Sequence, residues 1–221
     1  MDLSSFAEGP LLWIALLVFI IGTLVRMAQF LFVARTKDKP FYNYFSLKYI
    51  LATLVRWLLP LNVDVKKNPV FILCVYLFHL CLIVVPIWLG GHVSLWEESR
   101  FGWSWSSLPD KWADWMTLLL LAISIFFILR RALLPDLRII TTLADYLMIV
   151  VTALPFATGY FLTHGTLDSI AFLGDNMRLL HVLSAELMLI LIPFTRLSHS
   201  VLFFFSRAAA GVEFGRRGYS I

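Results

Sequence analysis

The sequence has little charge and almost no cysteine for its length. Charged residues make up 14% of the 221 residues and apolar residues 60%, against about 25% and about 45–50% in an average soluble domain. The two cysteines, Cys74 and Cys81, lie in one apolar run and form neither a C-x-x-C nor a C-x-x-C-H motif. These features exclude a large soluble domain, and they argue against iron–sulfur clusters, thiolate zinc sites and covalently attached haem.

Five apolar runs are long enough to cross a bilayer, because one crossing takes roughly 20 residues. They cover about 10–33, 69–91, 112–129, 143–162 and 177–205. Backbone polar groups in lipid must be satisfied within their own segment, so each run is predicted to be a helix. The first run follows no basic segment and precedes no small-residue cleavage site, which favours a retained span. The predicted fold class is an all-α integral membrane protein, with five transmembrane helices forming a single bundle over residues 1–221.

Lysine and arginine are concentrated in alternate connections of this bundle. Segments 34–67 and 130–142 and the C-terminal tail contain thirteen of them, whereas the other connections contain three. By the positive-inside rule the N-terminus is predicted outside and the C-terminus in the cytoplasm, in a multi-pass protein of the cell inner membrane. The excess of basic residues, 18 against 14 acidic ones, therefore reflects topology, and no nucleic-acid partner is expected. The thirteen are Arg35, Lys37, Lys39, Lys48, Arg56, Lys66, Lys67, Arg130, Arg131, Arg138, Arg207, Arg216 and Arg217; the three are Arg100, Lys111 and Arg178.

Segment 34–67 also contains an amphipathic stripe. Its apolar members recur at helical spacing, while Lys48 and Arg56 lie off the stripe. This pattern predicts a helix that either lies on the cytoplasmic membrane surface or is covered by a partner subunit. The stripe consists of Leu47, Ile50, Leu51, Leu54, Trp57, Leu58 and Leu61.

Tryptophans crowd the external connection that follows the second run, where a belt at the level of the lipid headgroups is expected. They are Trp88, Trp96, Trp103, Trp105, Trp112 and Trp115.

All five histidines lie within or at the end of a predicted span. Ionisable groups in a membrane are costly and are usually functional. Imidazole offers a neutral nitrogen lone pair suited to iron or copper, and the carboxylate and thiolate partners of a zinc or copper centre are missing nearby. Haem fits better, because it occupies a helix bundle and needs only an axial imidazole from each side. The histidines are His79, His92, His164, His181 and His199.

The spacing of four histidines predicts two pairs. His181 and His199 are 18 residues apart, so on a straight helix they share a face and lie roughly 27 Å apart. His79 and His92 are 13 residues apart, roughly 20 Å along a helix but about 140° out of register. The second and fifth runs are antiparallel, so His79 would meet His199 and His92 would meet His181.

Residues between His79 and His92 can change the helical rotation that places these two histidines out of register. Pro86 can kink the helix, and Gly90 and Gly91 can free its end. The arrangement then predicts two bis-histidine haems stacked across the bilayer. The other interpretation is a haem-free anchor or transporter subunit, in which the histidines are interhelical hydrogen-bonding residues.

Several motifs resemble one family. The stretch Arg178–His181 (RLLH) and the stretch Pro193–His199 (PFTRLSH) closely resemble the last span of the cytochrome b (gamma) subunit of membrane-bound respiratory nitrate reductase. Similarity continues in Gly22–Arg26, Leu77–His79 and Arg130–Asp145. The resemblance covers most of the chain.

This resemblance implies five spans and two non-covalent b haems. His79 and His199 would hold the haem nearer the cytoplasm, and His92 and His181 the outer one. A separate possibility is a single haem, held by His79 and His199. The longer histidine spacing in the second run, the longer first cytoplasmic loop and the shorter tail depart from the nitrate reductase subunit and imply a relative of it. The long loop and the stretch Gly90–His92 (GGH) look more like the branch found in transmembrane redox complexes of sulfate-reducing bacteria. That branch implies an electron-transfer subunit of an oxidoreductase, working with quinone, iron–sulfur and other integral membrane subunits, and periplasmic multihaem cytochrome c.

Other polar residues have more than one interpretation. By resemblance Lys111 is a candidate to hydrogen-bond a quinone, or it is an interface lysine that snorkels. His164 is a candidate proton relay, an alternative partner of His181 in place of His92, or an ordinary loop histidine. Arg26 and Arg196 either pair with haem propionates or snorkel.

Overall fold

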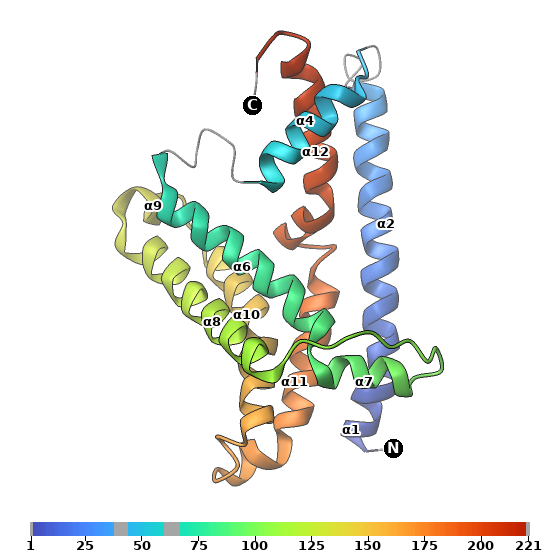
Figure 1. Ribbon diagram of the computed structural model, residues 1–221, viewed down its shortest axis with the longest axis vertical. Helices are drawn as coiled ribbons and strands as arrows, with labels where there is room; N and C mark the ends of the chain where they lie inside the picture. Colours follow the sequence, from blue (N-terminus) through green and yellow to red (C-terminus); the bar gives the residue numbers. More distant parts are fainter. Residues whose placement is uncertain (1, 38–43, 60–66, 220–221) are drawn as a thin grey trace. The chain divides into compact units, whose positions relative to one another are not determined.

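The computed structural model describes residues 2–37, 44–59 and 67–219, and over these ranges the regular elements are helices (Figure 1). Four of them are long and apolar enough to cross a membrane, or five if the bent pair α11 and α12 counts as one span. This confirms an all-helical, multi-pass class of membrane protein. The long helices are α2 (Leu12–Lys37, preceded by α1, Leu3–Phe6, and a π-helical turn, Ala7–Leu11), α6 (Pro69–Trp88), α8 (Asp110–Leu133), α10 (Leu143–His164), α11 (Ala171–Leu191) and α12 (His199–Gly215). The shorter ones are α4 (Leu47–Leu58), α7 (Gly90–Glu98), α9 (Pro135–Ile140) and a 3₁₀ turn, Arg196–Ser198.

Packing divides the chain into two compact units. The first contains Glu8–Ile72 and Glu186–Ile221, and the second contains Asp2–Ala7 and Leu73–Ala185. Helix α11 passes from the second unit to the first after Ala185.

In the first unit, α4 packs on α12 (Figure 1). The contact is close because α12 presents glycines: a Cβ at Gly211 would lie 2.6 Å from Thr53 Oγ1, and a Cβ at Gly215 would lie 2.5 Å from the Tyr49 ring. The guanidinium of Arg207 stacks 4.0 Å above the Trp57 ring.

The predicted apolar stripe of α4 is therefore partly buried and partly exposed. Ile50 is buried together with Thr53, whereas Leu47, Leu51 and Leu58 remain exposed. One side of α4 is thus covered by a helix of the same chain. Leu61, at the end of the predicted stripe, lies outside the described residues, as do Lys39 and Lys66 of the basic segment.

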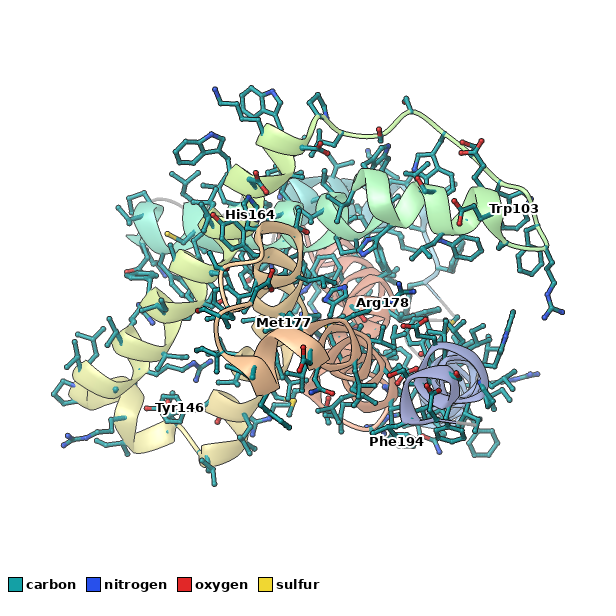
Figure 2. All side chains as sticks on the ribbon, turned by 90° about the horizontal axis from the view of Figure 1, so that it is seen from below. Trp103, Tyr146, His164, Met177, Arg178 and Phe194 are labelled. Carbon is teal, nitrogen blue, oxygen red and sulfur yellow. The ribbon has the colours of Figure 1, made fainter. Side chains whose placement is uncertain are left out.

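In the second unit, α8 and α10 run side by side (Figure 1). The core of this unit is an apolar cluster that contains the buried Cys81, and the partly buried Cys74 packs against this cluster. Aromatic side chains gather where α7 ends, and Trp96 and Trp103 stack with ring centres 5.8 Å apart. Figure 2 shows Trp103 at the tip of the loop that follows α7.

Two of the predicted spans are interrupted. The run 69–91 ends as a helix at Trp88 and resumes at Gly90 as α7, so the expected change of rotation between His79 and His92 occurs at Leu89. The run 177–205 is not one helix, and the straight-helix distance expected between His181 and His199 is wrong.

The cause of the second break lies in its sequence. Helix α11 ends at Leu191, and α11 and α12 are bent by 75° at the break. Pro193 has no N–H and its ring clashes with the preceding turn, which ends a helix. The Thr195 hydroxyl then donates to Leu191 O at 2.7 Å and accepts from Leu197 N at 3.2 Å, which satisfies groups that the break leaves free.

Candidate functional site

A pair of histidines lies in the second unit. The rings of His92, on α7, and His181, on α11, have centres 6.1 Å apart and planes inclined by only 11°. Both side chains are half-buried. The structure thus brings together one of the two predicted pairs, and it pairs His181 with His92 rather than with His164.

The helix break at Leu89 positions His92. The last carbonyls of a helix have no intrahelical donor, and here three such groups, in Pro86, Ile87 and Trp88, are satisfied from outside α6. His92 Nδ1 donates to Pro86 O at 2.9 Å, Trp105 Nε1 to Ile87 O at 2.9 Å, and the Leu108 amide to Trp88 O at 2.7 Å. The loop after α7 therefore folds back onto the end of α6 and fixes the point from which His92 projects.

Helix α10 positions His181. Pro155 O accepts from His181 Nδ1 at 3.0 Å, and Thr158 Oγ1 lies 3.3 Å from the same nitrogen. A Cβ at Gly159 would lie 3.0 Å from His181 Cε1 and 3.2 Å from Nδ1. The ring therefore lies directly against a glycine, where another side chain would crowd it.

These contacts determine the tautomer of both rings. A carbonyl oxygen only accepts hydrogen bonds, so Nδ1 carries the proton in His92 and in His181, and Nε2 keeps its lone pair. The same arrangement holds for His79 with Val75 O at 2.8 Å and for His199 with Arg196 O at 2.8 Å. Metal-ligating histidines have this second interaction almost without exception.

His164 has the same Nδ1 contact but a different environment. Its Nδ1 donates to Tyr160 O at 3.0 Å, its ring stacks on Tyr160 at 4.2 Å, and its Nε2 lies 3.3 Å from Asp114 Oδ2. The Nδ1 contact alone therefore does not define a ligand. Figure 2 shows His164 at the end of α10, and the contact with Asp114 joins that end to the first turns of α8.

The other predicted residues lie as follows. Lys111 is exposed in the first turn of α8, one helical turn before Asp114. Arg26 Nε donates to Pro193 O at 2.9 Å, and a Cβ at neighbouring Gly22 would lie 2.8 Å from the same proline, so α2 packs on the break after α11. Arg196 begins the 3₁₀ turn before α12.

His79 and His199 belong to different units, and their pairing stays a prediction. His79 lies on α6, and its ring meets Phe78 edge-on at 5.6 Å. His199 is the first residue of α12.

Glu186 is buried deep in α11, with only 2% of its surface exposed. Neither carboxyl oxygen has a hydrogen-bond partner among the described residues.

Three residues that position the two histidines were not predicted from the sequence. Thr158, Gly159 and Trp105 have no local pattern that links them to a histidine. Ser184 follows His181 by three residues on the same helix face, which is a usable signal. Its hydroxyl donates to His181 O at 2.8 Å.

The fold and this histidine pair define a multi-pass, all-helical membrane protein with facing imidazoles. The chain is 36% identical to a Nitratidesulfovibrio vulgaris (strain Hildenborough) protein over 221 aligned positions, covering 97% of this chain and 95% of that protein. The chain belongs to the same family as that protein. No protein-family model matches the sequence, and no solved structure matches it.

Proposed function

We propose that this protein is a dihaem b-type cytochrome, the membrane subunit of a respiratory redox complex in the cell inner membrane. It transfers electrons across the membrane between quinol or quinone, or a periplasmic multihaem cytochrome c, and a cytoplasmic iron–sulfur partner. The observation that carries this proposal is the pair His92 and His181, with ring centres 6.1 Å apart and nearly parallel planes. When bound, the haem iron supplies one-electron chemistry, and the protein supplies ligands, orientation and a low dielectric.

The distance between the rings fits a bis-histidine haem. A bond between a metal and an imidazole nitrogen is about 2.0 Å, and the centre of the ring lies roughly 1 Å beyond that nitrogen, so two imidazoles bound to one metal from opposite sides would have ring centres roughly 6 Å apart. The donor set fits as well. Among the residues that the structure describes, no group of three or more His, Cys, Asp or Glu side chains could hold a metal ion, whereas haem needs only two axial ligands from the protein.

The second haem in this proposal is held by His79 and His199. Both rings have Nδ1 bonded to a backbone carbonyl, so Nδ1 carries the proton and Nε2 would be the ligand atom. Arg26 and Arg196 are the candidate partners of haem propionates, because the arginine fork suits a carboxylate. Arg26 uses its Nε for Pro193 O, so its terminal nitrogens would make that contact.

A quinone site belongs to the same proposal. Lys111 and Asp114 lie one turn apart on α8, and Asp114 contacts His164 at 3.3 Å. Quinol oxidation releases protons, and an imidazole beside a carboxylate is suited to accept them. Lys111 is the candidate donor to a quinone oxygen. The loop charges predict this end to be outside.

The test is haem content. The full chain is purified in detergent and reduced, and its b-type α band and pyridine haemochrome are measured per polypeptide. We expect two haems, one haem after His92→Ala or His181→Ala, and two haems in the control His164→Ala. One haem in the wild type would leave the single-haem form of the proposal, and zero would overturn it.

A haem-free anchor or transporter subunit is the second candidate. The observation that favours it is His164, whose two ring nitrogens contact Tyr160 O and Asp114 Oδ2 without any ligand. If all five histidines act in this way, replacing His181 and His199 by alanine lowers thermal stability and changes no spectrum.

A further inference from the structure

We infer that Thr158 is a positioning residue for His181, and that its hydroxyl tunes the electronic environment of the haem which that histidine holds. Thr158 lies on α10 and reaches two groups of α11: its Oγ1 is 3.3 Å from His181 Nδ1 and 3.1 Å from Ser184 Oγ. This inference rests on the proposed function, because the reporter of the effect is the haem.

The direction of the hydrogen bonds follows from the chemistry of the groups. Pro155 O, 3.0 Å from His181 Nδ1, can only accept, so the proton belongs to the imidazole. Thr158 therefore presents a lone pair to Nδ1–H. The hydroxyl proton of Thr158 has its own acceptors: Leu154 O at 2.9 Å, Pro155 O at 3.2 Å or Ser184 Oγ at 3.1 Å.

His181 is thus held at one nitrogen by two oxygens of α10. Gly159 closes the space beside the ring, since a Cβ there would lie 3.0 Å from Cε1. The imidazole cannot rotate without losing the Nδ1 contacts or moving against α10. Hydrogen bonds of this kind fix ring orientation and raise the basicity of a metal-binding imidazole.

The contact between Thr158 and His181 is expected to lower the midpoint potential of the haem that His181 holds. Oxygen lone pairs beside Nδ1–H stabilise positive charge on the imidazole, and that charge is larger when the iron is oxidised. Replacing the Thr158 hydroxyl by a methyl group removes part of this stabilisation. The midpoint potential of the haem held by His181 is therefore expected to rise, while that of the other haem stays constant.

Thr158 also makes a hydrogen bond within its own helix, and this structural role must be separated from its contact with His181. Threonine in a helix often bonds the carbonyl four residues earlier, and Thr158 does so with Leu154. Thr152, on the same helix, is buried and makes this kind of bond, to Met148 O at 2.8 Å. Thr152→Val is therefore the matched control, because it removes a buried hydroxyl of α10 that does not reach a histidine.

The experiment compares Thr158→Val, Thr158→Ser and Thr152→Val in the full chain loaded with haem. The measurements are haem per polypeptide, a redox titration followed at the α band, and the electron paramagnetic resonance spectrum of the oxidised protein. We expect unchanged haem content, an upward shift of one midpoint potential and altered g-values of one haem in Thr158→Val. Thr158→Ser and Thr152→Val should match the wild type.

Failure of this inference is distinct from failure of the proposed function. Wild-type protein without haem overturns the proposed function. Haem-loaded Thr158→Val with both potentials and both sets of g-values unchanged overturns the inference alone, as does an equal shift in Thr152→Val. If Thr158→Val does not fold, Thr158→Ala is compared with Thr152→Ala under the same criteria.

Discussion

Gly159 provides a sharp test of the geometry around His181. In Gly159→Ala the new methyl group would lie 3.0 Å from His181 Cε1 and 3.2 Å from Nδ1. Carbon atoms in contact prefer about 3.5–4.0 Å, so the ring must move by a few tenths of an ångström. It cannot move freely, because Nδ1 is hydrogen-bonded to Pro155 O at 3.0 Å.

Two energetic effects of Gly159→Ala oppose each other. Overpacking typically costs about 1–3 kcal/mol, while alanine is favoured over glycine in a helix by roughly 1 kcal/mol. The net loss of stability is therefore expected to be small, about 0–2 kcal/mol by these two ranges. The effect on the His181 ligand is not offset by helix propensity, because it depends on ring position alone.

The assay for Gly159→Ala is haem content together with the absorbance spectrum and the thermal unfolding midpoint in detergent. We expect loss of one haem per chain, or a change of its spectrum, with an unfolding midpoint that falls only as far as a net loss of about 0–2 kcal/mol requires. Gly91→Ala is the control, since a Cβ at Gly91 has no atom within 4 Å although it adjoins His92. A Gly159→Ala protein with wild-type haem content and spectrum would refute the placement of His181 against α10.

Three further predictions concern other parts of the molecule. In Gly215→Ala the new Cβ would lie 2.5 Å from a tyrosine ring of α4, so this variant should separate α4 from α12 and lower the free energy of unfolding by about 1–3 kcal/mol. The control is Gly9→Ala, which has open space around the new Cβ and should unfold like the wild type. Equal unfolding midpoints of the two variants would contradict the packing of α4 on α12. Glu186→Leu removes a buried carboxyl without hydrogen-bond partners among the described residues, so its unfolding midpoint should stay constant or rise, and a large fall would reveal a partner. Trp105→Phe removes the donor to a carbonyl at the end of α6. It should lower the free energy of unfolding by about 1 kcal/mol and change the spectrum of the haem held by His92. The control is Trp115→Phe, on the exposed face of α8, which should show neither change.

Much of the helical architecture could be predicted because its causes are local. The apolar runs are long enough to span a bilayer, and lipid leaves the backbone no partner outside its own helix. The periodicity in segment 47–61 predicted α4, and the glycines at 90 and 91 predicted a change of rotation before His92. Pro193 was visible in the sequence as well, yet a continuous fifth helix was expected, because composition alone does not show whether a membrane helix bends or breaks at proline.

By itself, the sequence determined the class of protein, the location of its apolar helical segments and the concentration of histidines in them, since hydropathy and residue identity are properties of short segments. Only the tertiary structure decided that His92 rather than His164 faces His181, and that Asp114 contacts His164. The same is true of the groups that hold the rings: Pro155 and Thr158 lie 26 and 23 residues from His181. Such contacts depend on how helices pack and where they break, and no short-range pattern encodes them.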